Sequence, residues 1–249
     1  MPAGAEGPTE VGLPEGTGGG LRLAGLTWPE VAARSGSTVL AVPVGSTEQH
    51  GPHLPLSTDT DVAVALADGL ASARTDVLVA PPVAYGSSGE HAGFPGTLSI
   101  GQDALELVLL ELGRSADAFA GIVFVSAHGG NAEPVAKAVG RLSYEGRSVR
   151  AWHPVGAATG ELDAHAGYTE TSVLMALSPA SVRSESAAAG GIDAGAPSTD
   201  LLARLRAGGV ASVSPNGVLG DPAAASAAAG RRLVDDWLSD LVTSLDGWP

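Results

Sequence analysis

Cysteine is absent from this 249-residue sequence, which excludes disulfides, thiolate metal sites and a cysteine nucleophile. Basic residues are scarce: 13 Lys and Arg face 27 Asp and Glu, giving a formal net charge of −14. Because such a chain would repel nucleic-acid phosphates and anionic lipid, we expect neither as a partner. The sequence also lacks a run of about 18 apolar residues and a signal peptide, so we expect a cytoplasmic protein outside the membrane.

Apolar residues, by contrast, are abundant. The sequence is 44% hydrophobic and only 16% charged, which is enough apolar material for a full core and excludes a disordered chain. Residues 1–20 are mostly Gly, Pro, Glu and Thr, and we expect a flexible N-terminal tail there. Residues 21–249 are predicted to form a single domain.

Strand and helix patterns alternate along the chain. Short, nearly continuous apolar runs are typical of strands buried on both faces, and they occur at 38–44, 77–80, 122–125 and 148–152. Apolar residues with helical spacing occur at 61–73, 103–119, 132–144 and 222–245. This alternation predicts an α/β fold with a mostly parallel central sheet that helices cover on both sides.

Histidines and acids gather where the predicted strands end. Glu48, His50 and Asp59 follow the first strand, and His128 follows the third in a glycine-rich turn. An extended chain would point Glu48 and His50 the same way, because side chains two residues apart share a face. In open α/β sheets the ligand crevice lies beyond the carboxyl ends of the strands. We therefore expect these side chains to meet in one site.

A third polar patch spans residues 163–172 and supplies His165 and Glu170. Glu170 precedes the apolar stretch 173–177, so it is expected in the first turn of a buried helix, where the helix dipole favours an anion. A buried carboxylate there would need a cation or hydrogen-bond donors.

Each of these residues also has a simpler interpretation. Thr58 or Asp59 lies where a helix N-cap is expected, His50 and His53 could be satisfied by loop backbone, and Glu170 could simply begin a helix. Taken together, however, imidazole and carboxylate ligands suit Zn, Mn or Fe(II). About five such ligands, with one carboxylate bridging, are what a two-metal hydrolase needs.

The sequence resembles the creatininase family of binuclear metal amidohydrolases, in blocks that run in the family's order. The blocks are EQHGPHLP at 48–55 with Asp59, YGSSGEH at 85–91 continuing to FPGTL at 94–98, HGGN at 128–131, and HAGYTETS at 165–172. The resemblance implies a three-layer α/β/α sandwich, a homo-oligomer such as a hexamer or octamer, and hydrolysis of amide C–N bonds by metal-activated water.

The same resemblance implies roles for individual residues. It implies two divalent ions per subunit, Zn, Fe(II) or Mn, with Asp59 as the bridging ligand. His165 matches the histidine that transfers a proton, and Glu170 is expected to serve in catalysis as well as in metal binding. The implied metal ligands are Glu48, His50, Asp59, His128 and Glu170. Residues expected to orient these ligands or to meet the substrate are His53, Tyr85, His91, Gly129, Gly130 and Asn131; for His91, gating the pocket and merely holding its own turn are both open.

One departure from the family bears on the substrate. Creatininase itself has a Tyr-Glu pair after the third-block histidine, where this chain has Gly129 and Gly130, which disfavours creatinine. The acidic, glycine-rich leader and residues 217–222 are most similar to the mycofactocin-system branch. That branch is a peptidase acting on the modified C-terminal region of a ribosomally made redox-cofactor precursor peptide. The alternatives are a creatinine amidohydrolase or formamide deformylase of the same family, and a non-catalytic metal- or sugar-binding domain.

Overall fold

A parallel four-stranded sheet forms the centre of the protein, as a computed structural model shows for residues 21–155, 163–190, 204–205 and 207–249. The predicted tail, residues 1–20, lies outside the described residues. All three strand pairings are parallel and the strand order is β2-β1-β3-β4. The strands are β1 (Val39–Val44), β2 (Val77–Val79), β3 (Gly121–Ser126) and β4 (Val149–Trp152).

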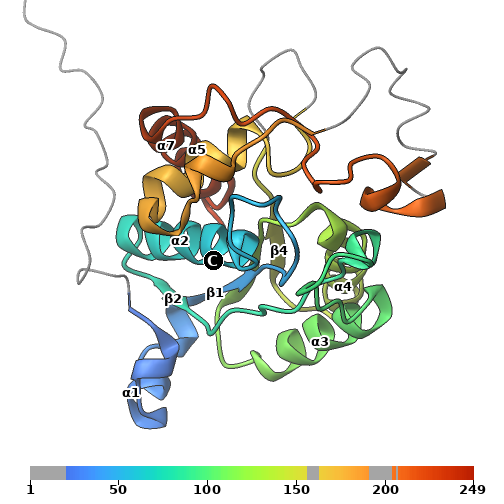
Figure 1. Ribbon diagram of the computed structural model, residues 1–249. Coiled ribbons are helices and arrows are strands. Elements are labelled where there is room, and N and C mark those ends of the chain that lie inside the picture. Colours follow the sequence, from blue (N-terminus) through green and yellow to red (C-terminus); the bar gives the residue numbers. More distant parts are fainter. Residues whose placement is uncertain (1–20, 156–162, 191–203, 206) are drawn as a thin grey trace, which may run out of the picture.

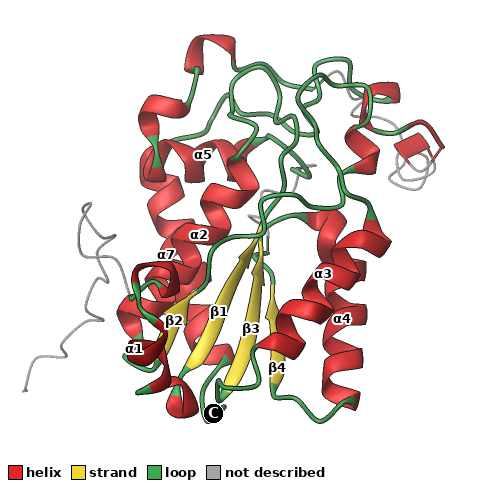
Figure 2. Ribbon diagram, turned by 90° about the horizontal axis from the view of Figure 1, so that it is seen from below, coloured by secondary structure: helices red, strands yellow, loops and turns green. Residues whose placement is uncertain are grey.

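Helices cover both faces of this sheet, which confirms the predicted α/β/α sandwich (Figure 2). One layer contains α2 (Thr58–Ala73), α5 (Tyr168–Leu177) and α7 (Ala227–Ser244), and α5 and α7 lie side by side in Figure 1. The other layer contains α3 (Gln102–Ser115) and α4 (Ala132–Tyr144). A short helix, α1 (Trp28–Ala32), precedes the sheet and begins with a capping box between Thr27 and Glu30.

The strands β1 and β2 are apolar throughout because each face of the sheet has its own core. Leu40, Val42 and Phe124 pack in the core toward α3 and α4, whereas Val39 and Ala41 pack in the core toward α2, α5 and α7. Successive residues of a strand point to opposite faces, so both must be apolar when both faces are covered.

Two predicted helix starts were wrong. The helix expected from residue 61 begins at Thr58, with Ser57 in the N-cap position, so neither Thr58 nor Asp59 is the cap. The Asp59 carboxylate instead accepts a hydrogen bond from the Ser46 hydroxyl at the end of β1, 2.6 Å away. The helix expected from residue 222 begins at Ala227, because the Ser226 hydroxyl accepts the N–H of Ala229 and caps the helix there.

Loops gather beyond the carboxyl ends of the strands, past the tips of the arrows in Figure 2. They include the connections from β1 to α2 and from β3 to α4, which carry most of the predicted site residues. Among the helices that the structure describes, none has the length and apolar character that a membrane crossing requires.

Candidate metal centre and active site

The end of β1 and the start of α2 lie unusually close together. A Cβ atom added to Gly45 would lie only 2.4 Å from the Thr60 Cα, so glycine is required for this approach. The Thr60 hydroxyl donates a hydrogen bond of 2.9 Å to the carbonyl oxygen of Ser46, which holds the two segments together. As a result, Asp59 in the first turn of α2 faces the residues that follow β1.

The five expected metal ligands come together in two groups that share Asp59. The ligand atoms of Glu48, Asp59 and His128 lie within 4.8 Å of one another, and those of His50, Asp59 and Glu170 do likewise. Asp59 Oδ2 lies 3.1 Å from His128 Nδ1, and Asp59 Oδ1 lies 3.1 Å from His50 Nε2. Each oxygen of the shared carboxylate therefore faces a different group, which is the arrangement a bridging ligand needs.

Glu48 is the least satisfied group in this cluster. Its side chain is fully buried, and neither carboxylate oxygen accepts a hydrogen bond. Nε2 of His91 lies 3.3 Å from Oε1 and Nε2 of His128 lies 3.2 Å from Oε2. Burial, and then the charge of Asp59, raise the pKa of Glu48 to about 7. A buried carboxylate with free lone pairs fits a bound cation, so the donor set suits a metal.

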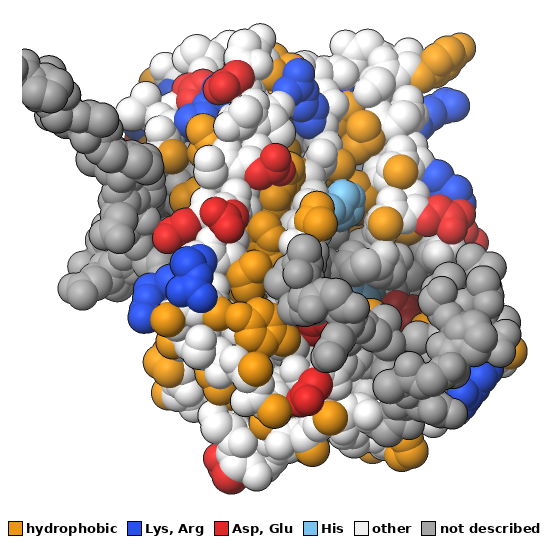
Figure 3. Space-filling model, turned by 90° about the horizontal axis from the view of Figure 1, so that it is seen from above, with side chains coloured by type: hydrophobic (Ala, Val, Ile, Leu, Met, Phe, Trp, Pro, Cys, Tyr) orange, Lys and Arg blue, Asp and Glu red, His pale blue; other side chains and the backbone are white. Residues whose placement is uncertain are grey.

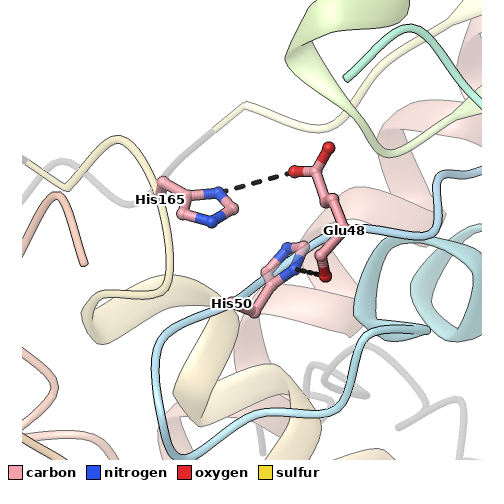
Figure 4. A group of neighbouring side chains, drawn as sticks. All are labelled: Glu48, His50 and His165. Atoms are coloured by element: carbon pink, nitrogen blue, oxygen red, sulfur yellow. Dashed lines mark hydrogen bonds and ion pairs between the residues drawn. The ribbon is translucent and has the colours of Figure 1, made fainter. Parts of the chain in front are cut away.

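The two imidazoles beside Asp59 present one nitrogen each to the shared carboxylate. His50 Nδ1 donates to the Glu48 backbone carbonyl at 3.2 Å, as the dashed line in Figure 4 shows, so Nε2 is the nitrogen that faces Asp59. His128 Nε2 lies 3.0 Å from the Ser87 carbonyl oxygen, which leaves Nδ1 toward Asp59. Such backbone partners fix the orientation of a histidine ligand.

Opposite charges stabilise each other across this cluster. Burial opposes protonation of His50 and His128, yet their contacts with Asp59 raise the pKa of each to about 10. Burial would likewise raise the pKa of Asp59, but the two histidines hold it well below its usual range. A divalent cation would take the place of these imidazole protons, since histidine ligands bind metal in the neutral form.

His165 joins the same cluster from a different part of the chain (Figure 4). Its Nε2–H donates to the Gln49 backbone carbonyl at 2.8 Å, so Nδ1 carries the lone pair and lies 3.8 Å from Glu48 Oε1. Burial, together with the nearby His50 and His91, holds the pKa of His165 well below its usual range. His165 is therefore neutral and has a free nitrogen beside the expected ligands.

Glu170 lies in the first turn of α5, as the sequence predicts, and at the edge of the cluster. Its Oε2 accepts the Ala166 N–H at 2.5 Å and lies 3.8 Å from His50 Nε2. The side chain is 25% exposed, in contrast to the fully buried Glu48. Among the five expected ligands, Glu170 is thus the one whose side chain is most exposed to solvent.

Two of the other expected residues support the cluster. His53 Nε2 lies 2.8 Å from the Thr171 hydroxyl and ties the β1–α2 loop to α5. The Asn131 amide accepts the Ser87 N–H and donates to the Gly45 carbonyl, both at 2.9 Å, and so links three strand-end segments.

The glycines of the HGGN block differ from each other. A Cβ on Gly130 would lie 2.4 Å from His128 Nε2 and 2.2 Å from the Ser87 carbonyl oxygen, so a side chain there would displace the histidine. A Cβ on Gly129 would meet no atom within 4 Å.

His91 is buried beside the ligand cluster, whereas Tyr85 is exposed to solvent. His91 is buried, with its ring centre 4.4 Å from that of His165, and burial and His128 lower its pKa to about 3. Tyr85 is 51% exposed, and within the described residues no hydrogen bond joins its side chain to the expected ligands.

Three polar residues at the site were not among those predicted from the sequence. The Gln49 amide nitrogen lies 2.8 Å from His91 Nδ1 and donates to the Gly217 carbonyl at 3.0 Å. The Ser46 hydroxyl binds Asp59, as described above, and Glu90 Oε1 lies 3.6 Å from His128 Nε2. The position of Gln49 between two predicted ligands was a usable signal, whereas the contact of Glu90 depends on a distant loop.

A cavity of about 160 Å³ opens beside the cluster. Asp59, His165 and Glu170 form part of its wall, and apolar residues of α2, α5 and α7 form another part. On the face shown in Figure 3, histidine and hydrophobic side chains lie next to one another at the surface. Three of the cluster residues, Asp59, His165 and Glu170, therefore border a space that can hold a small group.

Comparisons with known proteins identify the family of the chain. The family model described as creatinine amidohydrolase matches residues 24–245. A protein of Mycolicibacterium smegmatis named mycofactocin precursor peptide peptidase is 51% identical over 216 residues, covering 84% of this chain and 85% of the relative. A crystal structure of creatininase superimposes with a TM-score of 0.78 at 24% identity, covering 91% of this chain and 96% of the other.

A mutant creatininase described as Zn-Zn type also superimposes, with a TM-score of 0.76 at 24% identity over 90% of this chain and 96% of the other. These findings confirm the resemblance, the fold and the class of metal-dependent amide hydrolase predicted from the sequence. The chain belongs to the creatininase family.

Proposed function

We propose that this protein is a metal-dependent peptidase that cleaves an amide C–N bond in the modified mycofactocin precursor peptide and releases its C-terminal portion during redox-cofactor biosynthesis. The observation that carries the proposal is the 51% identity to the Mycolicibacterium smegmatis peptidase across most of both chains. The departure of this chain from creatininase at Gly129 and Gly130 supports a substrate other than creatinine.

Two divalent ions are proposed to bind the two groups of ligands, with Asp59 bridging them. Glu48 and His128 complete one group, and His50 and Glu170 complete the other. The oxygens of Glu48, which are buried and accept no hydrogen bond, support this assignment. Carboxylate and imidazole ligands suit Zn, Mn and Fe(II). When bound, such ions would supply Lewis-acid activation of water and of the scissile carbonyl.

His165 is proposed to deliver the proton that the leaving nitrogen needs. Its Nε2–H is held by the Gln49 carbonyl, so its Nδ1 is the nitrogen that takes up a proton and passes it on. Glu170 borders both the ligand cluster and the cavity, and it is proposed to orient the attacking water there. The Ala166 N–H fixes the Glu170 carboxylate for that task.

The protein is also proposed to be a homo-oligomer located in the cytoplasm. A homo-oligomer, a hexamer or octamer, is supported by apolar side chains exposed on α3, where Leu107 is 58% exposed and Val108 and Leu112 are also exposed. A cytoplasmic location is supported by the absence of cysteine, which fits a reducing compartment.

Removing the metal tests the proposed activity directly. The purified protein would be treated with a chelator, reloaded with Zn, Mn or Fe(II), and assayed on a precursor peptide ending in Val-Tyr, on creatinine and on a formamide. We expect cleavage of the peptide alone, lost on chelation and restored by metal, with circular dichroism unchanged. Full activity in metal-free protein, or turnover of only the small amides, would contradict the proposal.

A further inference from the structure

Gln49 connects separate segments of the chain at the edge of the ligand cluster. It is 5% exposed, its backbone N–H donates to the Thr97 hydroxyl at 3.1 Å, and its backbone carbonyl accepts the His165 Nε2–H at 2.8 Å. Its side-chain amide contacts the Gly217 carbonyl and His91 Nδ1. A residue that lies between two expected metal ligands in the sequence therefore also contacts two further histidines.

Backbone partners fix which end of the Gln49 amide is oxygen and which is nitrogen. Oε1 accepts the Gly51 N–H at 2.8 Å, and Nε2 donates to the Gly217 carbonyl oxygen at 3.0 Å. Exchanging the two amide atoms would bring two donors together at Gly51 and two acceptors together at Gly217. An amide nitrogen carries two hydrogens, so one hydrogen remains for a neighbouring histidine.

That remaining hydrogen has two candidate acceptors. Nε2 of Gln49 lies 2.8 Å from His91 Nδ1 and 3.1 Å from His165 Nε2. Donation to His91 satisfies every group, because His165 Nε2 keeps its own hydrogen for the Gln49 carbonyl oxygen. Donation to His165 would deprive that carbonyl oxygen of its donor and leave His91 Nδ1 facing the amide without a hydrogen bond. His91 Nδ1 is therefore the acceptor, and the ring proton of His91 is on Nε2.

We propose that Gln49 is a positioning residue that fixes the proton of His91 on Nε2, so that His91 presents an N–H to Glu48. Nε2 of His91 lies 3.3 Å from Glu48 Oε1, and Nδ1 of His165 lies 3.8 Å from the same oxygen, along the dashed line in Figure 4. The proposal rests on the proposed function, because it takes Glu48 as a metal ligand and His165 as the residue that transfers a proton. It gives His91 a role other than gating the pocket or holding its own turn.

The same hydrogen bonds leave one ring nitrogen of the pair available for a proton. His91 Nδ1 accepts from the Gln49 amide, and the Nε2 atoms of His91 and His165 already carry hydrogens. His165 Nδ1 is the nitrogen that remains. Gln49 thus keeps His91 from competing with His165 for the proton that the reaction moves.

Gly217 holds the Gln49 amide in this position. Its φ of +80° lies in the left-handed region, and a Cβ atom added there would lie 1.9 Å from Gln49 Oε1. Gly217 begins the segment 217–222, which the sequence comparison with the family singled out. Gly217→Ala therefore displaces the amide without changing its chemistry.

Nitrogen-15 NMR of protein labelled on histidine tests the assignment without an activity measurement. We expect the signals of His91 to show a proton on Nε2 and a lone pair on Nδ1, in both zinc-loaded and metal-free protein. The His91→Leu variant identifies these signals by their loss. A proton on Nδ1 of His91 in the original protein would overturn the proposal.

Gln49→Glu should reverse the tautomer of His91. A carboxylate only accepts hydrogen bonds, so the ratio of the Nε2–H to the Nδ1–H form should change from at least about tenfold in favour of Nε2–H to at least about tenfold in favour of Nδ1–H, since a net hydrogen bond is worth roughly tenfold. Gln102→Glu, at the other glutamine of the chain, is the control and should leave the ratio unchanged. An unchanged ratio in Gln49→Glu would contradict the proposal.

Gly217→Ala keeps the test informative if Gln49→Glu does not fold. It should lower the preference for the Nε2–H form of His91 at least about threefold, because the displaced amide no longer donates to Nδ1. A preference equal to that of the original protein would show that Gln49 does not set the tautomer.

A double-mutant cycle on the metal-loaded protein tests whether Gln49 acts through His91. Gln49→Met should lower kcat about ten- to a hundredfold in the original protein but less than about twofold in the His91→Leu variant, with KM nearly unchanged in both. Equal losses in the two backgrounds would show a structural effect that is independent of His91 and would overturn the proposal.

The results separate this proposal from the proposed function. Failure of the metal-loaded protein to cleave any peptide would overturn the peptidase function, while the NMR signals of His91 would still decide the tautomer. A protein that cleaves the peptide but carries the His91 proton on Nδ1 would keep its proposed function and lose the role assigned to Gln49.

Discussion

Two clusters of charged side chains lie at opposite ends of the sheet, and they are organised differently. At the end of α4, Glu145 accepts hydrogen bonds from Arg114, Arg141 and Arg147, at 2.6–3.1 Å. Arg147 also binds Asp117 at 2.7 Å, so this cluster is complete within the chain. At the carboxyl ends of the strands, in contrast, Glu48 is buried with both oxygens free of hydrogen bonds.

The difference shows which charges belong to the fold and which serve a ligand. Arginine forks around Glu145 satisfy its oxygens and hold α3, α4 and the start of β4 together. The strand-end cluster is compensated only in part by histidines, which leaves free lone pairs in its centre. Buried polar groups without partners are costly, so their presence marks a site that a bound group completes.

The largest effect is expected for Asp59, which both groups of ligands share. Asp59→Ala should reduce bound metal from about two ions per subunit to near zero and lower kcat by about a thousandfold or more, because both ions lose a ligand. Elemental analysis and peptide turnover measure this. Asp61→Ala, two residues further along α2, is the control and should keep the bound metal and the kcat of the original protein. Equal metal content in the two variants would contradict the shared role of Asp59.

Glu48→Gln should act in opposite directions with and without metal. In metal-free protein it should raise the free energy of unfolding by about 1–3 kcal/mol, because a buried carboxylate that histidines compensate only in part becomes a neutral amide. In metal-loaded protein it should remove most of the stabilisation that metal provides. Urea unfolding of both forms measures the two changes.

Glu145→Gln is the counterpart of Glu48→Gln in the completed cluster. It should lower stability whether or not metal is present, since it weakens three arginine contacts. A stabilising effect of Glu145→Gln, or a destabilising effect of Glu48→Gln in metal-free protein, would remove the distinction between the two clusters.

A smaller effect is expected for Gln49, whose amide nitrogen lies beside His91 Nδ1 and donates a hydrogen bond to the Gly217 carbonyl oxygen. Gln49→Met should lower kcat about ten- to a hundredfold while metal content and KM stay close to the original values, as is usual for residues that orient metal-site histidines. Gln102→Met, at the start of α3 and away from the site, is the control. Loss of metal from Gln49→Met would show a ligand-binding effect instead.

The smallest effect concerns the pH dependence of the Glu145 cluster. Hydrogen bonds from Arg114 and then Arg141 lower the pKa of Glu145 to about 2 from the ordinary value of 4.5. A lowered pKa means that the stabilisation is present above the ordinary value and is lost as the pH falls through 4.5 toward 2. The difference in Tm between the original protein and Glu145→Gln should therefore shrink over that range; a constant difference would contradict the assignment.

The layers of the fold could be predicted because strand and helix periodicities are local properties. The continuous apolar run of β1 indicated a strand buried on both faces, and both faces are buried. The start of α2 was missed because it depends on Gly45 and Ser46, which contact the helix only after folding. Propensity alone does not report such long-range contacts.

The site was predictable in its members but not in its supporting contacts. Histidines and acids at strand ends predicted a polar site, and the resemblance to the creatininase family implied the five expected ligands, whose side chains lie together in the structure. The pairing of Gln49 with His91, and the part of the cavity wall that Trp237 contributes from the last helix, join segments far apart in the sequence. Only tertiary packing brings these segments together, so the spacing of residues in the sequence indicated neither the contact of Gln49 with His91 nor the position of Trp237.

The absence of a side chain at Gly45 limits how the candidate metal centre can vary. Because the backbone there touches the beginning of α2, even one added methyl group would push the helix away. That movement would withdraw the shared carboxylate from both histidines at once, and the two halves of the centre would separate together. A substitution at Gly45 would therefore disrupt both halves of the centre together, although Gly45 itself contributes no ligand atom.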